Sequence, residues 1–189
     1  MGMVELLLNW AGPFSLRTPE SRQAFRPPSE PGVYIWTVGT RRALSYVGQA
    51  ADLRARLYQH IHNALGGAYW IYEREYFEGR TVPSDVSAYE PEPATFNQRF
   101  LDEFDRLSQL ALLNLTSFEM YWAVVEGGRQ QREEVESAYI AWAREQSPRV
   151  VQNEALSRAG DASNPLLILS SFEGEAPQEF PRKLRWPTV

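Results

Sequence analysis

The sequence predicts an α+β fold in which a small three-stranded antiparallel sheet is flanked by helices and carries a helical insertion. Two runs rich in β-branched and aromatic residues, 32–38 and 43–47, are separated by a short turn and predict a β-hairpin. A third strand is expected over 117–125, because the second half of this run is continuously apolar, as in a central strand. Apolar residues at helical spacing predict the flanking helices over 50–63, 95–113 and 129–146.

The segments outside this framework give weaker signals. Residues 1–10 contain a short apolar run without the basic start or the long apolar stretch of a signal peptide, so we expect a buried first strand there. The run is also too short to span a bilayer. Residues 17–31 contain four prolines and no periodic apolar pattern, which predicts an extended arm leading into the core. A further strand is expected over 166–169.

Composition and charge narrow the classes of function. Of the 189 residues, 43% are hydrophobic and 23% are charged, as in a globular domain that buries a sizeable core. The absence of cysteine excludes disulfides and thiolate metal sites and makes the cytoplasm the expected location. A net charge of −5 argues against a nucleic-acid partner, because phosphate contacts usually leave a basic surface. All the basic residues except Lys183 are arginines, which grip phosphate bidentately; genomic base composition is the alternative explanation of this bias.

The hairpin and the helix after it carry groups that move protons and bind phosphate. Side chains alternate between the faces of a strand, so Tyr34 and Tyr46 can meet on one face if the hairpin register pairs them. Arg56 and His60 lie four residues apart and project from the same side of a helix. Phosphodiester hydrolysis needs such groups, together with a carboxylate for a divalent ion. One carboxylate can suffice for magnesium, which keeps most of its waters.

Four short patterns in this chain resemble the GIY-YIG nuclease superfamily. They are PGVYIW, then YVG, then L-x-x-R-x-x-x-H over 53–60, and a later Glu and Asn; valine replaces isoleucine in both tripeptides. Glu136 is similar to the family's metal-binding glutamate, and Asn153 resembles its closing asparagine. The resemblance implies an N-terminal arm over 1–30 and a nuclease domain over 31–155, with an insertion at about 66–116. Residues 156–189 would form a C-terminal extension packed on the core.

The resemblance also implies a role for each site residue. Glu136 would hold one Mg²⁺ or Mn²⁺ ion, and Arg56 would clamp the scissile phosphate. Either Tyr34 or His60 would activate the attacking water, and a tyrosine would need a nearby cation to do so, because its ordinary pKa is about 10. Tyr46 would orient the water. The implied catalytic set is Tyr34, Tyr46, Arg56, His60, Glu136 and Asn153, in which Asn153 braces the site.

The nucleic-acid contacts are expected near the start of the same helix. Arg54 and Arg56 would contact nucleic acid together with Gln49. Many members of the superfamily carry lysine at the position of Gln49, so this departure weakens the attraction for phosphate. The aromatic residues of the insertion have two interpretations, base stacking or a subsidiary core, and we favour the core. They are Tyr69, Trp70, Tyr72, Tyr76 and Phe77.

Purely structural interpretations exist for each of these residues taken singly. A strand tyrosine such as Tyr34 is usually a packing residue, and His60 beside apolar neighbours is usually a half-buried histidine with its hydrogen bonds satisfied. Glu136 follows Glu133 and Glu134, and a run of charges on a helix is usually a solvated face. The complete set, in the order of the superfamily, favours the functional interpretation.

We therefore expect a metal-dependent endonuclease that hydrolyses DNA, in restriction or another defence against foreign DNA. The alternatives are a catalytically inactive module that binds nucleic acid and an interbacterial DNase toxin. DNA is the expected partner, with single-stranded and distorted DNA among the candidate substrates. A homodimer would suit a palindromic target, since twofold sites match twofold proteins. No membrane partner is expected.

Overall fold

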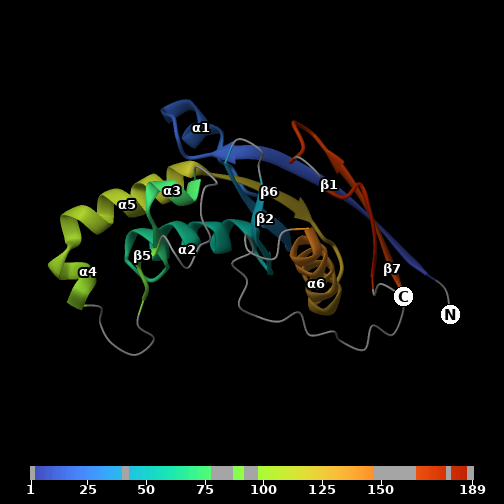
Figure 1. The fold of residues 1–189 in the computed structure, drawn as a ribbon. Helices are drawn as coiled ribbons and strands as arrows, with labels where there is room; N and C mark the ends of the chain where they lie inside the picture. Colours follow the sequence, from blue (N-terminus) through green and yellow to red (C-terminus); the bar gives the residue numbers. More distant parts are fainter. Residues whose placement is uncertain are drawn as a thin grey trace.

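A computed structural model describes residues 3–39, 43–77, 87–91, 98–146, 165–177 and 180–186. A six-stranded sheet in the order β3-β2-β6-β1-β7-β8 runs through the molecule, with α2 and α5 on one side and α6 on the other (Figure 1). Its strands are β1 (Val4–Ser15), β2 (Gly32–Val38), β3 (Ala43–Ala50), β6 (Phe118–Val124), β7 (Leu166–Phe172) and β8 (Lys183–Trp186). A separate two-stranded sheet joins β4 (Ile71–Tyr72) to β5 (Ser87–Tyr89).

The prediction of a small three-stranded sheet is wrong. The strands β2, β3 and β6 do pair antiparallel as expected, but β1 pairs antiparallel with β6 and parallel with β7, and β8 adds a further antiparallel edge. The sheet is therefore mixed and has six strands. The β1–β7 pair places Val4 beside Leu166 and Trp10 beside Phe172. Such a pairing between opposite ends of the chain leaves no local turn or periodicity in the sequence from which it could be read.

The central strand β2 separates two hydrophobic cores. All its residues are buried, because β3 and β6 flank it and both its faces are covered. Since side chains alternate between faces, Val33 and Ile35 enter the core beneath α6, whereas Tyr34 and Trp36 face α2 (Leu53–Leu65). Tyr34 and Trp36 therefore share one face of β2, as the alternation of side chains along a strand requires.

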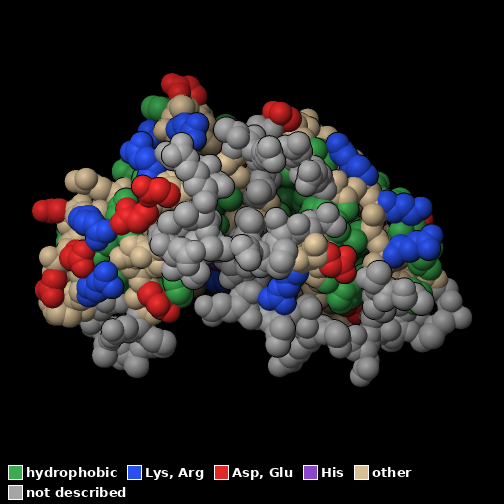
Figure 2. Space-filling model, viewed as in Figure 1, with side chains coloured by type: hydrophobic (Ala, Val, Ile, Leu, Met, Phe, Trp, Pro, Cys, Tyr) green, Lys and Arg blue, Asp and Glu red, His purple; other side chains and the backbone are tan. Residues whose placement is uncertain are grey.

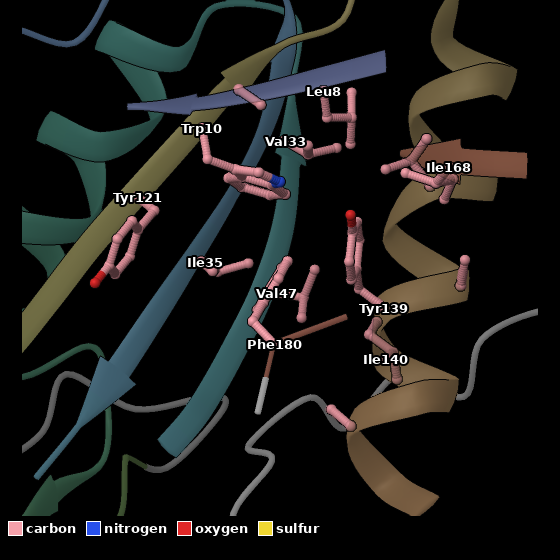
Figure 3. Close-up of a cluster of buried hydrophobic side chains, with 14 of the residues drawn as sticks. Leu8, Trp10, Val33, Ile35, Val47, Tyr121, Tyr139, Ile140, Ile168 and Phe180 are labelled. Atoms are coloured by element: carbon pink, nitrogen blue, oxygen red, sulfur yellow. The ribbon is translucent and has the colours of Figure 1, made fainter. Parts of the chain in front are cut away.

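The core beneath α6 (Arg129–Gln146) holds the sheet against that helix. Trp10 meets Tyr139 and Phe180 edge to face, with ring centroids 5.6 Å apart in both pairs (Figure 3). The Tyr139 hydroxyl lies 2.6 Å from Ser170 Oγ, so its polar end is satisfied inside the core. The expected helix over 129–146 and its buried stripe, which includes Val135, are confirmed. This packing fixes the position of α6 relative to β2 and β3.

Two helical segments differ from the prediction. The expected helix over 95–113 is divided at Glu103 into α4 (Gln98–Asp102) and α5 (Phe104–Ser117), and Phe104 at the start of α5 is exposed. The expected arm over 17–31 contains the short helix α1 (Pro19–Ala24). The Thr18 side chain caps this helix and Pro19 occupies its first turn, where a proline starts a helix rather than breaking it.

The insertion supplies a small layer outside α2. It consists of β4, α3 (Arg74–Phe77), β5, α4 and α5, and its aromatic residues Tyr72 and Tyr76 are buried against the α2 side of the sheet. Over α4 and α5, acidic and basic side chains alternate on the surface (Figure 2), and Arg106 pairs with both Glu73 and Glu103. Within the ranges that the structure describes, no helix combines the length and hydropathy needed to cross a bilayer.

Candidate active site

The candidate site lies at the edge of the sheet formed by β3. Because β3 is an edge strand, α2 on one face and α6 on the other can both reach it. Tyr34 of β2 and Tyr46 of β3 share the α2 face, and their rings stack with centroids 6.0 Å apart. The register pairs Tyr34 with Gly48 and Trp36 with Tyr46, so the two tyrosines are diagonal rather than directly opposed.

Gly48 allows this arrangement. A Cβ atom on Gly48 would overlap the hydroxyl and the Cζ atom of Tyr34, which lies directly over the glycine. A Cβ atom on Gly32 would likewise overlap the backbone carbonyl of Ala123 in β6. Gly32 of the PGVYIW pattern and Gly48 of the YVG pattern are therefore required, because a neighbouring group approaches each of them closely.

His60 is the buried centre of the site. It is 5% exposed, its Nε2 lies 2.6 Å from the Tyr34 hydroxyl oxygen, and its Nδ1 lies 2.8 Å from the Tyr69 hydroxyl oxygen. Burial, followed by the charge of Arg56, lowers the pKa of His60 to about 3. The imidazole is therefore neutral near pH 7 and holds a single ring proton.

Arg56 links the members of the site. Its Nε donates to the Tyr34 hydroxyl oxygen at 3.3 Å, and its Nη1 donates to Gln59 Oε1 at 2.7 Å. Its charge favours the ionised forms of Tyr34, Tyr46 and Glu136. The half-buried guanidinium is thus the one group that acts electrostatically on every other titratable member of the cluster.

The two tyrosines differ in exposure. Tyr34 is fully buried, and burial raises its pKa well above the ordinary value. Burial also raises the pKa of the half-buried Tyr46, while the neighbouring Tyr34 hydroxyl and the charge of Arg56 oppose this rise. Tyr46 is therefore the member of the pair that reaches the surface.

Glu136 approaches from the other face of the sheet. The nearby backbone N–H of Gln49 favours its ionised form, and Glu136 in turn raises the pKa of Tyr46 through its charge. Burial, followed by repulsion from Glu133, raises the pKa of Glu136 to about 7, although Arg56 and the Gln49 N–H oppose this. The negative charge of the Glu136 carboxylate is thus only partly offset by its neighbours, and a nearby cation would favour its ionised form.

The donor set around Glu136 fits a magnesium-type ion. Within the described ranges, no group of three or more His, Cys, Asp or Glu side chains lies close enough to hold a metal ion together. A metal would therefore rely on Glu136 and water molecules. Mg²⁺ accepts such a set, because it retains several waters and often takes one carboxylate from a protein.

Gln49 joins β3 to α6. Its backbone N–H favours the ionised form of Glu136, and its side-chain oxygen accepts a hydrogen bond from Arg132 Nε at 3.4 Å. Arg132 is 7% exposed and also donates Nη1 to the Gly127 carbonyl at 3.1 Å. The sequence reasoning missed Arg132, for which the available signal was its position one helical turn before Glu136. The Gln49 side chain, expected to contact nucleic acid, is engaged within the protein.

The structure brings together five of the six expected catalytic residues. Arg54, expected to contact nucleic acid, is exposed and donates Nε to the Pro27 carbonyl at 3.0 Å. Asn153 lies outside the described residues. The five that meet at the β3 edge are Tyr34, Tyr46, Arg56, His60 and Glu136.

Tyr69 and Asn63 complete the site from the end of α2. The helix ends in a Schellman motif: Gly67 adopts φ +70°, its N–H bonds to the Ala64 carbonyl, and the Ala68 N–H bonds to the Asn63 carbonyl. The chain therefore folds back on the last turn of the helix. Asn63 Nδ2 then donates to the Tyr69 hydroxyl at 3.2 Å. Gly66-Gly67 signals the turn in the sequence, but nothing there connects Tyr69 with His60.

No protein-family model, curated protein or solved structure matches this chain. Function is therefore inferred from the chemistry of the site and from the motifs that resemble the GIY-YIG superfamily.

Proposed function

We propose that this protein is a metal-dependent endonuclease that hydrolyses phosphodiester bonds of DNA. The observation that carries the proposal is the convergence of two phenols, a guanidinium, an imidazole and a carboxylate at one sheet edge. They come from β2, β3, α2 and α6, so no local sequence constraint requires them to meet. A restriction or other defence role against foreign DNA is the biological context proposed for it.

Arg56 is the phosphate-binding group in this proposal. Its Nε and Nη1 are engaged by Tyr34 and Gln59, which hold the guanidinium plane in one orientation. A guanidinium carries five N–H donors, so further donors exist for the non-bridging oxygens of a phosphate. Held in place before the substrate binds, this charge stabilises the negative charge that develops on the phosphate during attack.

The tyrosine pair is the proton acceptor for the attacking water. His60 is a poor base at neutral pH because its pKa is lowered to about 3. Tyr34 and Tyr46 stack side by side and each affects the pKa of the other, so a proton removed from water at the more exposed Tyr46 enters a coupled pair. Arg56 favours the ionised form of both phenols. Both start from a raised pKa, so the pair needs further positive charge to act near pH 7.

Glu136 would hold the metal ion. A bound Mg²⁺ or Mn²⁺ ion would stabilise negative charge on the phosphate and favour the ionisation of neighbouring acidic groups. Glu136 is positioned for this by the Gln49 N–H and by the packing of α6 on β2 and β3. A carboxylate buried at this depth is stabilised only with a partner, and a hard cation supplies one.

The proposal is tested by cleavage of plasmid DNA and of single-stranded DNA with Mg²⁺ or Mn²⁺. Wild type should cut at least one substrate, and Glu136→Gln should cut none while still binding DNA. Glu134→Gln is the matched control, since Glu134 lies in the same run of charges and its carboxylate bonds to Gln130. Absence of metal-dependent cleavage by wild type on every substrate would overturn the proposal. Full cleavage by Glu136→Gln would show that Glu136 is not the metal ligand.

A further inference from the structure

The main sheet splits where β1 parts from β6. The antiparallel pairing between these two strands joins Ala11 to Trp122. The same register would next oppose Asn9 to Val124, but no such pair forms. In the described residues, Val4–Trp10 of β1 pairs only with β7, and the end of β6 pairs only with β2. The two strands therefore diverge and leave an open split between them.

Backbone groups of β1 point into this split. The N–H of Val4 donates to the carbonyl of Pro165 at 2.9 Å, on the β7 side, and the ladder with β7 continues without a register shift to Trp10. Successive residues of a strand present their N–H and C=O groups to opposite edges, so alternate positions face away from β7. Leu7 and Asn9 therefore present these groups to the split, where the described residues supply no backbone partner for them.

Val124 does the same on β6. The Val125 N–H donates to the Pro31 carbonyl at 2.9 Å, toward β2, so by the same alternation the N–H and C=O of Val124 point toward the split. Proteins usually protect a free strand edge with charged side chains, prolines or a covering segment. Here apolar side chains stand at the edge, since Leu7 is 61% exposed and Val124 is 38% exposed. Unpaired backbone beside exposed apolar side chains is what an added strand requires.

A groove of about 470 Å³ occupies the split. Leu7 and Trp122 contribute apolar surface to its lining, together with Val124. Glu126 and Glu173 add two exposed carboxylates, and no Lys or Arg of the described chain lines the groove. The groove therefore combines an apolar surface with negative charge that no lining cation offsets.

We propose that this groove binds an extended, basic segment of a partner protein by β-strand addition. An extended chain supplies N–H and C=O groups at the spacing of the free edges of β1 and β6, which a compact small molecule does not. Apolar side chains of the segment contact Leu7 and Val124, and its basic side chains pair with Glu126 and Glu173. A segment in which apolar and basic residues alternate meets both requirements. This binding site does not rest on the proposed nuclease function.

Amide hydrogen exchange followed by NMR tests whether the edge is open in the free protein. The N–H groups of Leu7, Asn9 and Val124 should exchange rapidly. Those of Leu6 and Leu8 are the internal control, because they face β7 and should be protected. Slow exchange at Leu7 and Asn9 in the free protein would mean that the edge is already covered, and it would overturn the proposal.

Binding is measured by fluorescence anisotropy with a labelled synthetic peptide of alternating valine and arginine. Its counterpart of alternating valine and glutamate is the control. The basic peptide should bind and should slow the exchange of the Leu7, Asn9 and Val124 amides, whereas the acidic peptide should bind about tenfold more weakly or not at all. No binding of the basic peptide, equal binding of the acidic one, or binding that leaves these amides unprotected would each refute the proposal.

Charge reversal tests the two carboxylates. The double variant Glu126→Lys, Glu173→Lys should bind the basic peptide about tenfold more weakly and the acidic peptide more tightly than wild type. Both side chains are exposed, so the variant should keep the wild-type Tm. Glu145→Lys is the control, since Glu145 is an exposed glutamate of α6 outside the groove. Unchanged affinities in the double variant, or an equal loss in Glu145→Lys, would show that the peptide does not bind in this groove. None of these measurements uses DNA, so their outcome is separate from that of the cleavage assay.

Discussion

The two sides of the β3 edge differ in how their polar groups are satisfied. On the α2 side, His60 lies between Tyr34 and Tyr69, and its bonds to them and the bonds from Arg56 and Asn63 to these tyrosines are all 3.3 Å or shorter. On the α6 side, Glu136 has the Gln49 N–H and the charge of Arg56 against burial and Glu133, and its pKa is raised to about 7. The first side is organised before any ligand arrives. The second leaves the charge of Glu136 only partly offset, and this is the side on which we propose that a metal ion binds.

The largest expected effect is the loss of Arg56, the residue that connects both sides. Arg56→Ala should lower the single-turnover rate of DNA cleavage roughly a thousandfold, since pre-positioned charges of this kind are worth that much in phosphoryl transfer. Arg54→Ala, from the same helix, is the comparison for DNA binding: it should raise the Kd for DNA but leave the single-turnover rate at saturating DNA little changed. Equal losses of cleavage rate in the two variants would mean that Arg56 contributes to DNA binding in general and has no particular role in linking the α2 residues to Glu136.

The next effect tests how tightly the α2 side is built. Gly48→Ala forces a Cβ atom into the Tyr34 hydroxyl, so Tyr34 must move away from His60. We expect a loss of about 3 kcal/mol in the free energy of unfolding, measured in urea, together with loss of cleavage. Gly128→Ala is the control, because a Cβ atom there meets nothing within 4 Å. A wild-type unfolding free energy for Gly48→Ala would show that this side is not closely packed.

The pH dependence of the free energy of unfolding isolates the contribution of His60. Its pKa is lowered from 6.5 in the unfolded chain to about 3 in the folded protein, so below pH 6.5 the unfolded state binds a proton that the folded state does not. The contribution of neutral His60 to the free energy of unfolding therefore has its full value above pH 6.5 and is lost as the pH falls toward 3. Between pH 7.5 and pH 5 the expected loss is about 2 kcal/mol.

The measurement is urea unfolding of wild type and His60→Gln at both pH values. The variant should lose about 2 kcal/mol less than wild type over this interval. His62→Gln, which alters an exposed residue of the same helix, should retain the wild-type dependence on pH. Identical pH dependence in wild type and His60→Gln would contradict the buried neutral state of His60.

The smallest expected effect probes the α6 side. An ion that binds the folded protein stabilises it by about 1.4 kcal/mol at ten times its Kd, so Mg²⁺ should raise the Tm of wild type by a few degrees. Glu136→Gln should remove this rise, and Glu134→Gln should keep it. The readout needs no DNA and is independent of cleavage. An equal rise in Glu136→Gln would place the ion elsewhere.

The sequence patterns were most informative where the determinants are local. The hairpin strands, the helix that carries Arg56 and His60, and the helix over 129–146 were predicted closely, because apolar periodicity and turn residues act within a few positions. The division of the predicted 95–113 helix at Glu103 was not predicted. The proximity of Glu136 to Tyr46 was expected only from the resemblance to a family, since no local rule relates residues so far apart.

The amino-acid sequence by itself determined the hairpin strands β2 and β3 and the alternation that puts Tyr34 and Trp36 on one face. It also determined the helix face shared by Arg56 and His60. These follow from backbone geometry with periods of two and 3.6 residues. Tertiary structure alone decided the mixed six-stranded sheet and the contact between Tyr69 and His60. Both depend on packing between segments joined by no periodic pattern: β7 closes on β1 from the other end of the chain, and a glycine turn folds Tyr69 back onto the helix that carries His60.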